Sequence, residues 1–120
     1  MAKRILLVDD SPIILEACQH ALAEAGYEVE TREGIEDLGE KGNEGFDLIL
    51  MDVQMPELFG DDVASILRHE RAVRTPIYLF STLSVEELRA RAAEARVDGF
   101  ISKSEGTAHL VAEVRKILGS

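Results

Sequence analysis

The sequence is short of positive charge and of cysteine, and it contains no tryptophan. It has 13 lysines and arginines against 23 acidic residues, so its formal net charge is −10 at pH 7. Binding to DNA or to an anionic membrane depends on basic side chains, so we expect neither partner. The single cysteine, Cys18, cannot form an internal disulfide, and this favours a reducing, cytoplasmic compartment.

Long apolar runs are also missing. No run approaches the roughly 20 residues that a membrane helix needs. The apolar stretch at residues 5–8 is too short for a signal peptide, and Asp9 and Asp10 follow it at once. A length of 120 residues with 46% hydrophobic content is typical of one domain with a real core. We therefore expect a single domain over residues 1–120 without an effector domain, which passes its state to another molecule.

The acidic residues are concentrated in the first half of the chain. Residues 16–47 contain ten acidic side chains, opposed only by Arg32 and Lys41. Residues 86–116 contain six acidic and six basic side chains. We interpret the first stretch as a solvated acidic face and the second as a charge-balanced surface.

Apolar runs of strand length alternate with segments of helical periodicity. Strands are expected at residues 4–8, 27–31, 46–51, 76–80 and 99–102. Helices are expected at residues 12–25, 34–42, 61–70, 84–95 and 107–118, the second of them weak. Ser11 and Ser84 are placed to cap two of these helices, Gly26 is placed to end the first, and Val85 and Leu88 are expected to face inward.

Five strand-then-helix units predict an α/β fold. The expected architecture is a doubly wound, five-stranded parallel sheet with the flavodoxin-like order 2-1-3-4-5 and helices on both faces. Ligands of such sheets bind beyond the carboxyl ends of the strands. The residues that follow each strand are therefore the candidates for function.

Polar side chains stand at these positions. Asp9 and Asp10 follow the first strand and Asp52 follows the third, which is its neighbour in the predicted order. Three carboxylates in one crevice repel one another unless a cation joins them, and Mg²⁺, or else Mn²⁺, suits such oxygen ligands. Ser81 follows the fourth strand and Lys103 the fifth. Each residue alone has an ordinary explanation as turn or surface chemistry, but together they predict a site for a phosphoryl group.

Four segments carry a resemblance to a known family. They are Leu-Leu-Val-Asp-Asp-Ser at 6–11, Leu-Met-Asp-Val-Gln-Met-Pro at 50–56 with Gly60, Pro-Ile-Tyr-Leu-Phe-Ser at 76–81, and Gly-Phe-Ile-Ser-Lys at 99–103. Together they resemble the stand-alone receiver domain of two-component response regulators, of the kind used in chemotaxis. The resemblance covers essentially the whole chain.

The resemblance implies a role for each candidate residue. Asp52 matches the phosphoryl acceptor, and the implied metal ligands are Asp10, Asp52, Asp9 through bound water, and the backbone carbonyl of Gln54. Lys103 matches the lysine that binds the phosphoryl group. Ser81 matches the switch hydroxyl, and Phe100 falls at the position of the switch aromatic.

The resemblance also implies the partners. A sensor histidine kinase or a phosphotransfer protein would supply the phosphoryl group as phosphohistidine. A downstream protein target would read the state from residues 85–118, which form the last helix, strand and helix. The chain would catalyse only its own phosphorylation and dephosphorylation, so it is not expected to be a turnover enzyme. We expect no direct nucleic-acid or membrane partner, and a monomer or weak dimer.

Three positions depart from the family pattern. Ser104 stands where the family usually has proline after a cis bond, and a cis bond without proline costs about 3–4 kcal/mol, so we expect a trans bond or local strain. Ser81 replaces the commoner threonine but keeps the hydroxyl. Leu83 and Gln54 stand where the family controls hydrolytic water, and an apolar Leu83 predicts slow self-dephosphorylation.

Other functions remain as alternatives. One is a receiver-like protein-binding module that works without phosphorylation, but the intact set of candidate residues argues against it. Another is a small Mg²⁺-dependent phosphatase with an aspartyl nucleophile, which would carry a second aspartate where Gln54 stands. A flavodoxin-like cofactor binder would need a phosphate-cradling loop after the first strand, where Asp-Asp-Ser-Pro stands instead.

Overall fold

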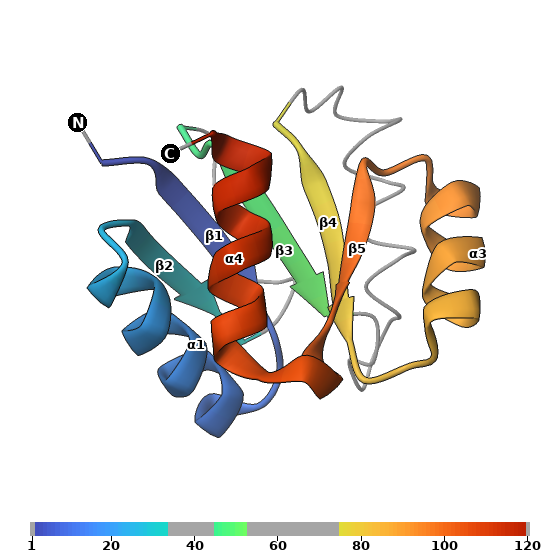
Figure 1. Cartoon of the computed structure of the whole chain (residues 1–120), viewed down its shortest axis with the longest axis horizontal. Helices are drawn as coiled ribbons and strands as arrows, with labels where there is room; N and C mark the ends of the chain where they lie inside the picture. The colour runs from blue at the N-terminus through green and yellow to red at the C-terminus, as the bar shows by residue number, and fades with distance from the viewer. Residues whose placement is uncertain (1, 34–44, 53–74, 120) are drawn as a thin grey trace.

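A parallel sheet with helices on both faces forms the core of the chain (Figure 1). The computed structural model describes residues 2–33, 45–52 and 75–119. The strands are β1 (Arg4–Val8), β2 (Glu28–Arg32), β3 (Leu48–Asp52), β4 (Ile77–Ser81) and β5 (Gly99–Ser102). The helices are α1 (Pro12–Glu24), α3 (Val85–Ala95), α4 (Gly106–Leu118) and the short 3₁₀ helix η2 (Lys103–Glu105).

The strand order is β2-β1-β3-β4-β5, and every neighbouring pair is parallel, which confirms the predicted topology. In Figure 1, α1 and α4 lie side by side in front of the sheet, whereas α3 lies beyond β5. The predicted helices at 34–42 and 61–70 lie outside the described residues. Among the helices of residues 2–33 and 75–119, none has the length and apolar character of a membrane span.

Alternate side chains of the strands fill two cores. One core lies on the α3 side and contains Leu6, Val8, Ile49, Met51, Leu79 and Leu88. The other lies under α1 and α4 and contains Ile5, Leu7, Leu22, Leu50, Phe80 and Leu110. Full burial of each large apolar side chain contributes about 1.5–3 kcal/mol. The central strands β1 and β3 are therefore firmly held, and so are the carboxylates at their ends.

The predicted helix ends agree with the structure. Ser11 Oγ accepts a hydrogen bond from Ile14 N–H at 3.4 Å, and Pro12 occupies the first position of α1. Gly26 follows the helix with φ +100°, a conformation that glycine adopts without steric cost. Ser84 Oγ accepts from Glu87 N–H at 3.2 Å and caps α3.

Some local predictions were wrong. Val85 is 47% exposed instead of facing inward, because it is the first residue of α3, and the helix reaches the core further along, with Leu88 and Ala92. Strands β3 and β4 extend to Asp52 and Ser81, so these residues end their strands instead of following them. The turn η2 between β5 and α4 was not predicted.

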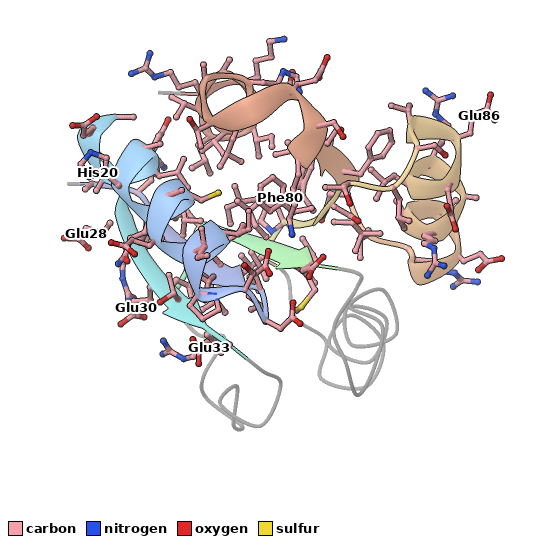
Figure 2. All side chains as sticks on the ribbon, turned by 90° about the horizontal axis from the view of Figure 1, so that it is seen from below. His20, Glu28, Glu30, Glu33, Phe80 and Glu86 are labelled. Atoms are coloured by element: carbon pink, nitrogen blue, oxygen red, sulfur yellow. The ribbon has the colours of Figure 1, made fainter. Side chains whose placement is uncertain are left out.

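The described part of the acidic stretch lies at the surface. Glu28, Glu30 and Glu33 are exposed on or beside the edge strand β2, as Figure 2 shows. Arg4 pairs with Glu30 at 3.2 Å, an exposed contact of small energetic value. Asp47 has a structural role, because its Oδ2 accepts a hydrogen bond from Arg4 N–H at 2.8 Å.

Candidate functional site

Three carboxylates meet at the carboxyl ends of β1 and β3. Val8 is the register partner of Met51, so the residues that follow them, Asp9 and Asp52, come side by side. Asp9 is 1% exposed and Asp52 is 3% exposed, whereas Asp10 faces solvent. One carboxylate oxygen from each of the three lies within 4.8 Å of the others. The sequence prediction of a convergent acidic cluster is confirmed.

The turn from β1 into α1 orients the cluster. Asp9 Oδ1 accepts a hydrogen bond from Ser11 N–H at 2.9 Å. The backbone N–H of Asp9 donates to the carbonyl of Arg32 on β2 at 3.0 Å. These two bonds fix Asp9 in the interior and let the chain turn Asp10 outward.

Lys103 brings positive charge to the two buried carboxylates. Its Nζ lies 2.5 Å from Asp9 Oδ2 and 3.4 Å from Asp52 Oδ1, and its side chain is 12% exposed. The ammonium also lies 5.1 Å from the centre of the Phe80 ring, which Figure 2 shows in the middle of the molecule. A buried carboxylate is costly unless it is paired, so Lys103 offsets part of the charge of Asp9 and Asp52.

Ser81 and Phe100 lie on the neighbouring strands β4 and β5, where Phe100 is the register partner of Leu79. Ser81 is fully buried at the end of β4, one residue beyond Phe80, which is the register partner of Asp52. Ser81 Oγ accepts a hydrogen bond from Leu83 N–H at 3.2 Å. Phe100 is half-buried against the core on the α3 side, and strand alternation puts Ser81 on that same side. The hydroxyl and the aromatic ring therefore share one face of the sheet.

Residues 5–115 match the family model of the response regulator receiver domain. The chain belongs to this family. Receiver domains serve phosphorylation-dependent signalling, and a receiver domain is not itself a turnover enzyme.

Curated relatives agree with this assignment. The gliding motility regulatory protein of Myxococcus xanthus is 42% identical over 85% of this chain and 13% of its own length. The nisin biosynthesis regulatory protein NisR of Lactococcus lactis subsp. lactis is 35% identical over 95% of this chain and 49% of its own length. The chain thus spans less than half the length of these two relatives. The polar-differentiation response regulator DivK of Brucella ovis is 26% identical and matches 99% of this chain and 98% of its own length.

Solved structures show the same fold. The chemotaxis protein CheY4 of Vibrio cholerae superposes with a TM-score of 0.86 at 30% identity, covering 98% of this chain and 100% of that one. The BeF₃-activated receiver domain of DrrB superposes with a TM-score of 0.83 at 28% identity, covering all of both chains.

The donor set of the receiver domain suits a hard divalent cation. Asp9, Asp10 and Asp52 offer carboxylate oxygens close enough to share one ion, and Mg²⁺ prefers such ligands. The exposure of Asp10 leaves the cluster open to solvent on one side. The remaining implied ligand, the carbonyl of Gln54, lies outside the described residues. The described residues therefore fit the ion.

The peptide bond before Ser104, where the family usually has proline, has the ordinary trans geometry. Among the described residues no peptide bond is cis, so Lys103 and Ser104 are joined in the trans form. The two residues lie in η2, whose first residue is Lys103. Sequence reasoning missed this turn and the contact of Lys103 with Asp9. The serine before Lys103 was the available signal, because a hydroxyl often caps a helical turn.

A small apolar cavity borders the site between α1 and α4. Its volume is about 170 Å³, and its lining includes Cys18, Phe80, Lys103 and Leu110. Burial raises the pKa of the Cys18 thiol above its usual range, the nearby positive charge of Lys103 opposes this, and Asp9 adds to it. The thiol is therefore protonated at neutral pH and does not compete with the carboxylates for a cation.

Burial likewise raises the pKa of Tyr78 on β4. The negative charges of Asp98 and Glu113 add to this effect. The phenol therefore remains uncharged at neutral pH.

Proposed function

We propose that this receiver domain, over residues 1–120, is a switch whose phosphoryl acceptor is Asp52. The observation that carries the proposal is a buried Asp52 within reach of Asp9, Asp10 and Lys103. A carboxylate oxygen of Asp52 attacks the phosphorus of a phosphohistidine. The new P–O bond forms as the P–N bond breaks, and the imidazole nitrogen keeps the electron pair.

The other residues of the site offset the negative charge of the phosphoryl group, either directly or by holding a cation. Asp9, Asp10 and Asp52 would hold Mg²⁺, or Mn²⁺, together with the backbone carbonyl of Gln54. When bound, the ion supplies positive charge against the oxygens of the phosphoryl group. Lys103 lies beside Asp52 and contributes a second positive charge there.

Ser81 and Phe100 change position when Asp52 is phosphorylated. The phosphoryl group on Asp52 adds strong hydrogen-bond acceptors. Ser81 moves inward to donate to it, and Phe100 fills the space that is vacated. Their common position on the α3 side of the sheet supports this coupling. A downstream protein then reads the state on α3, β5 and α4.

The proposal is tested with acetyl phosphate as donor. Incubation with Mg²⁺ should add the mass of one phosphoryl group to the intact protein, and chelation of the metal should prevent it. A protein that gains no mass under these conditions contradicts the proposed switch.

We also propose a cytoplasmic location, which agrees with the buried free thiol of Cys18.

The phosphohistidine partner should dock beside the acidic cluster on α1. Ile13 in the first turn of α1 is 79% exposed, and an exposed apolar side chain next to a reactive site suits a protein contact. We expect Ile13→Ala to slow transfer from a phosphotransfer protein that phosphorylates the wild type by about tenfold. Phosphorylation by acetyl phosphate should stay unchanged, because that donor makes no protein contact.

Val85 offers a matched control for this prediction. Like Ile13 it is an exposed apolar residue in the first turn of a helix, with 47% of its surface exposed, but that helix is α3. Val85→Ala should leave both reactions at the wild-type rate. If Ile13→Ala and Val85→Ala slowed transfer from the phosphotransfer protein equally, the proposed docking of that partner on α1 would be contradicted.

Leu83 should make the phosphorylated state long-lived. Its side chain packs against the core on the α3 side and has no group that could orient a water molecule. We expect Leu83→Asn to shorten the lifetime of the aspartyl phosphate about tenfold, because a polar side chain can position the attacking water. The loss of phosphoryl mass over time measures this, and a wild-type lifetime on the order of seconds would contradict it.

A further inference from the structure

The backbone turn that carries Lys103 is held by the residue before it. Ser102 ends β5, and its Oγ accepts a hydrogen bond from Ser104 N–H at 3.2 Å. Ser102 has extended geometry, with φ −81° and ψ 130°, whereas Lys103 begins the 3₁₀ helix η2. The hydroxyl satisfies one of the N–H groups that the first turn of a helix leaves without a backbone partner. Ser102 therefore fixes the point where the strand becomes a helical turn.

The far end of the turn is anchored as well. The backbone N–H of Gly106 donates a hydrogen bond to the carbonyl of Lys103 and closes the turn. At the surface, Glu105 Oε2 lies 2.9 Å from His109 Nε2 of α4. Gly106 joins the two helices with φ +87°, a conformation that side-chain-bearing residues rarely adopt. The turn is thus three residues long and is defined at both ends.

The position of this turn decides where the ammonium of Lys103 can lie. Nζ contacts Asp9 Oδ2 and lies 3.4 Å from Asp52 Oδ1. A lysine side chain is long and flexible, and ordering it at one place costs conformational entropy. A turn that holds the Cα atom in place limits the positions that Nζ can reach. By capping the turn, Ser102 therefore helps to hold the positively charged ammonium of Lys103 beside Asp52.

We infer that Ser102 is a positioning residue for phosphoryl transfer. Its hydroxyl caps the turn that holds Lys103 at Asp9 and Asp52, and through this it sets the rate at which Asp52 is phosphorylated. Ser102 is also the register partner of Ser81, so the cap lies beside the proposed switch hydroxyl. The inference rests on the proposed roles of Asp52 and Lys103.

Removal of the hydroxyl tests the inference. With acetyl phosphate and Mg²⁺, Ser102→Ala should lower the maximal phosphorylation rate about tenfold, because a small misplacement of a group at a reacting centre can cost up to about a hundredfold. Ser102→Thr keeps the hydroxyl and should retain the wild-type rate. Ser104→Pro removes the N–H donor and disfavours helical geometry at Lys103, so it should be slow as well.

A double-mutant comparison separates positioning from general damage. In a Lys103→Ala background, Ser102→Ala should cause no further slowing, because the residue that it positions is gone. Thr75→Val is the control for a lost hydroxyl. Thr75 lies just before β4, at the opposite end of that strand from Ser81, and its Oγ1 donates a hydrogen bond to the carbonyl of Phe46 at 3.2 Å. This variant should keep the wild-type rate.

The outcomes distinguish the inference from the proposed function. A wild-type rate for Ser102→Ala, or equal slowing by this change with and without Lys103, would overturn the inference and leave the switch intact. If the wild type itself is not phosphorylated, the proposed function fails instead.

Discussion

Asp52→Asn is expected to abolish phosphorylation. The asparagine amide lacks the anionic oxygen that attacks phosphorus, and a neutral side chain also removes one of the three carboxylates that would share the cation. Incubation with acetyl phosphate and Mg²⁺ should leave the intact mass of the variant unchanged, while the wild type gains one phosphoryl group.

The same variant should fold at least as well as the wild type. Asp52 is 3% exposed and lies beside the buried Asp9, so asparagine removes a repulsion between like charges. Thermal unfolding without metal measures this and shows that the lost reaction is not a lost fold. Equal gain of phosphoryl mass by the variant and the wild type would place the acceptor elsewhere.

Lys103→Ala is expected to slow phosphorylation of Asp52 about a hundredfold, the usual cost of losing one group that stabilises charge in a transition state. The ammonium lies 3.4 Å from Asp52 Oδ1, close to where the phosphoryl oxygens would gather. The initial rate of mass gain at saturating Mg²⁺ measures the effect. A rate within twofold of the wild type would contradict the proposed role of Lys103.

The same substitution should also make stability depend on metal. Without Lys103, the buried carboxylates of Asp9 and Asp52 lose a cationic partner, and breaking such a buried pair costs roughly 3 kcal/mol. A bound cation can take the place of the lost charge, so Mg²⁺ should raise the unfolding temperature of Lys103→Ala more than that of the wild type. An equal rise in both proteins would show that Lys103 does not offset the charge of the cluster.

The topology and the acidic cluster could be predicted because they depend on strong sequence patterns. The apolar runs of β1 and β3 are buried on both faces, and an aspartate follows each run: Asp9 comes directly after β1, and Asp52 is the last residue of β3. Parallel strands bring their carboxyl ends to one edge, so Asp9 and Asp52 had to meet once the strand order was known. Burial of the strands thus determines the place of the site.

The details that were missed depend on weaker local effects. Extending a strand by one residue changes its hydrogen bonding with the neighbouring strand very little. The sequence therefore did not predict that Asp52 and Ser81 would be the last residues of β3 and β4. The exposure of Val85 follows from its place at the start of α3, where apolar periodicity says little. The turn η2 is a single short turn, capped by the hydrogen bond from Ser104 N–H to Ser102 Oγ, and no apolar periodicity marks so short an element.

The central claim, that Asp52 is the phosphoryl acceptor, is tested most directly by locating the modification in the wild type. The protein is incubated with acetyl phosphate and Mg²⁺, the acyl phosphate is trapped by reduction with borohydride, and the peptides are mapped by mass spectrometry. We predict that the reduced residue is Asp52 alone. Modification of Asp9 or Asp10, or an Asp52 peptide that stays unmodified, would contradict the account.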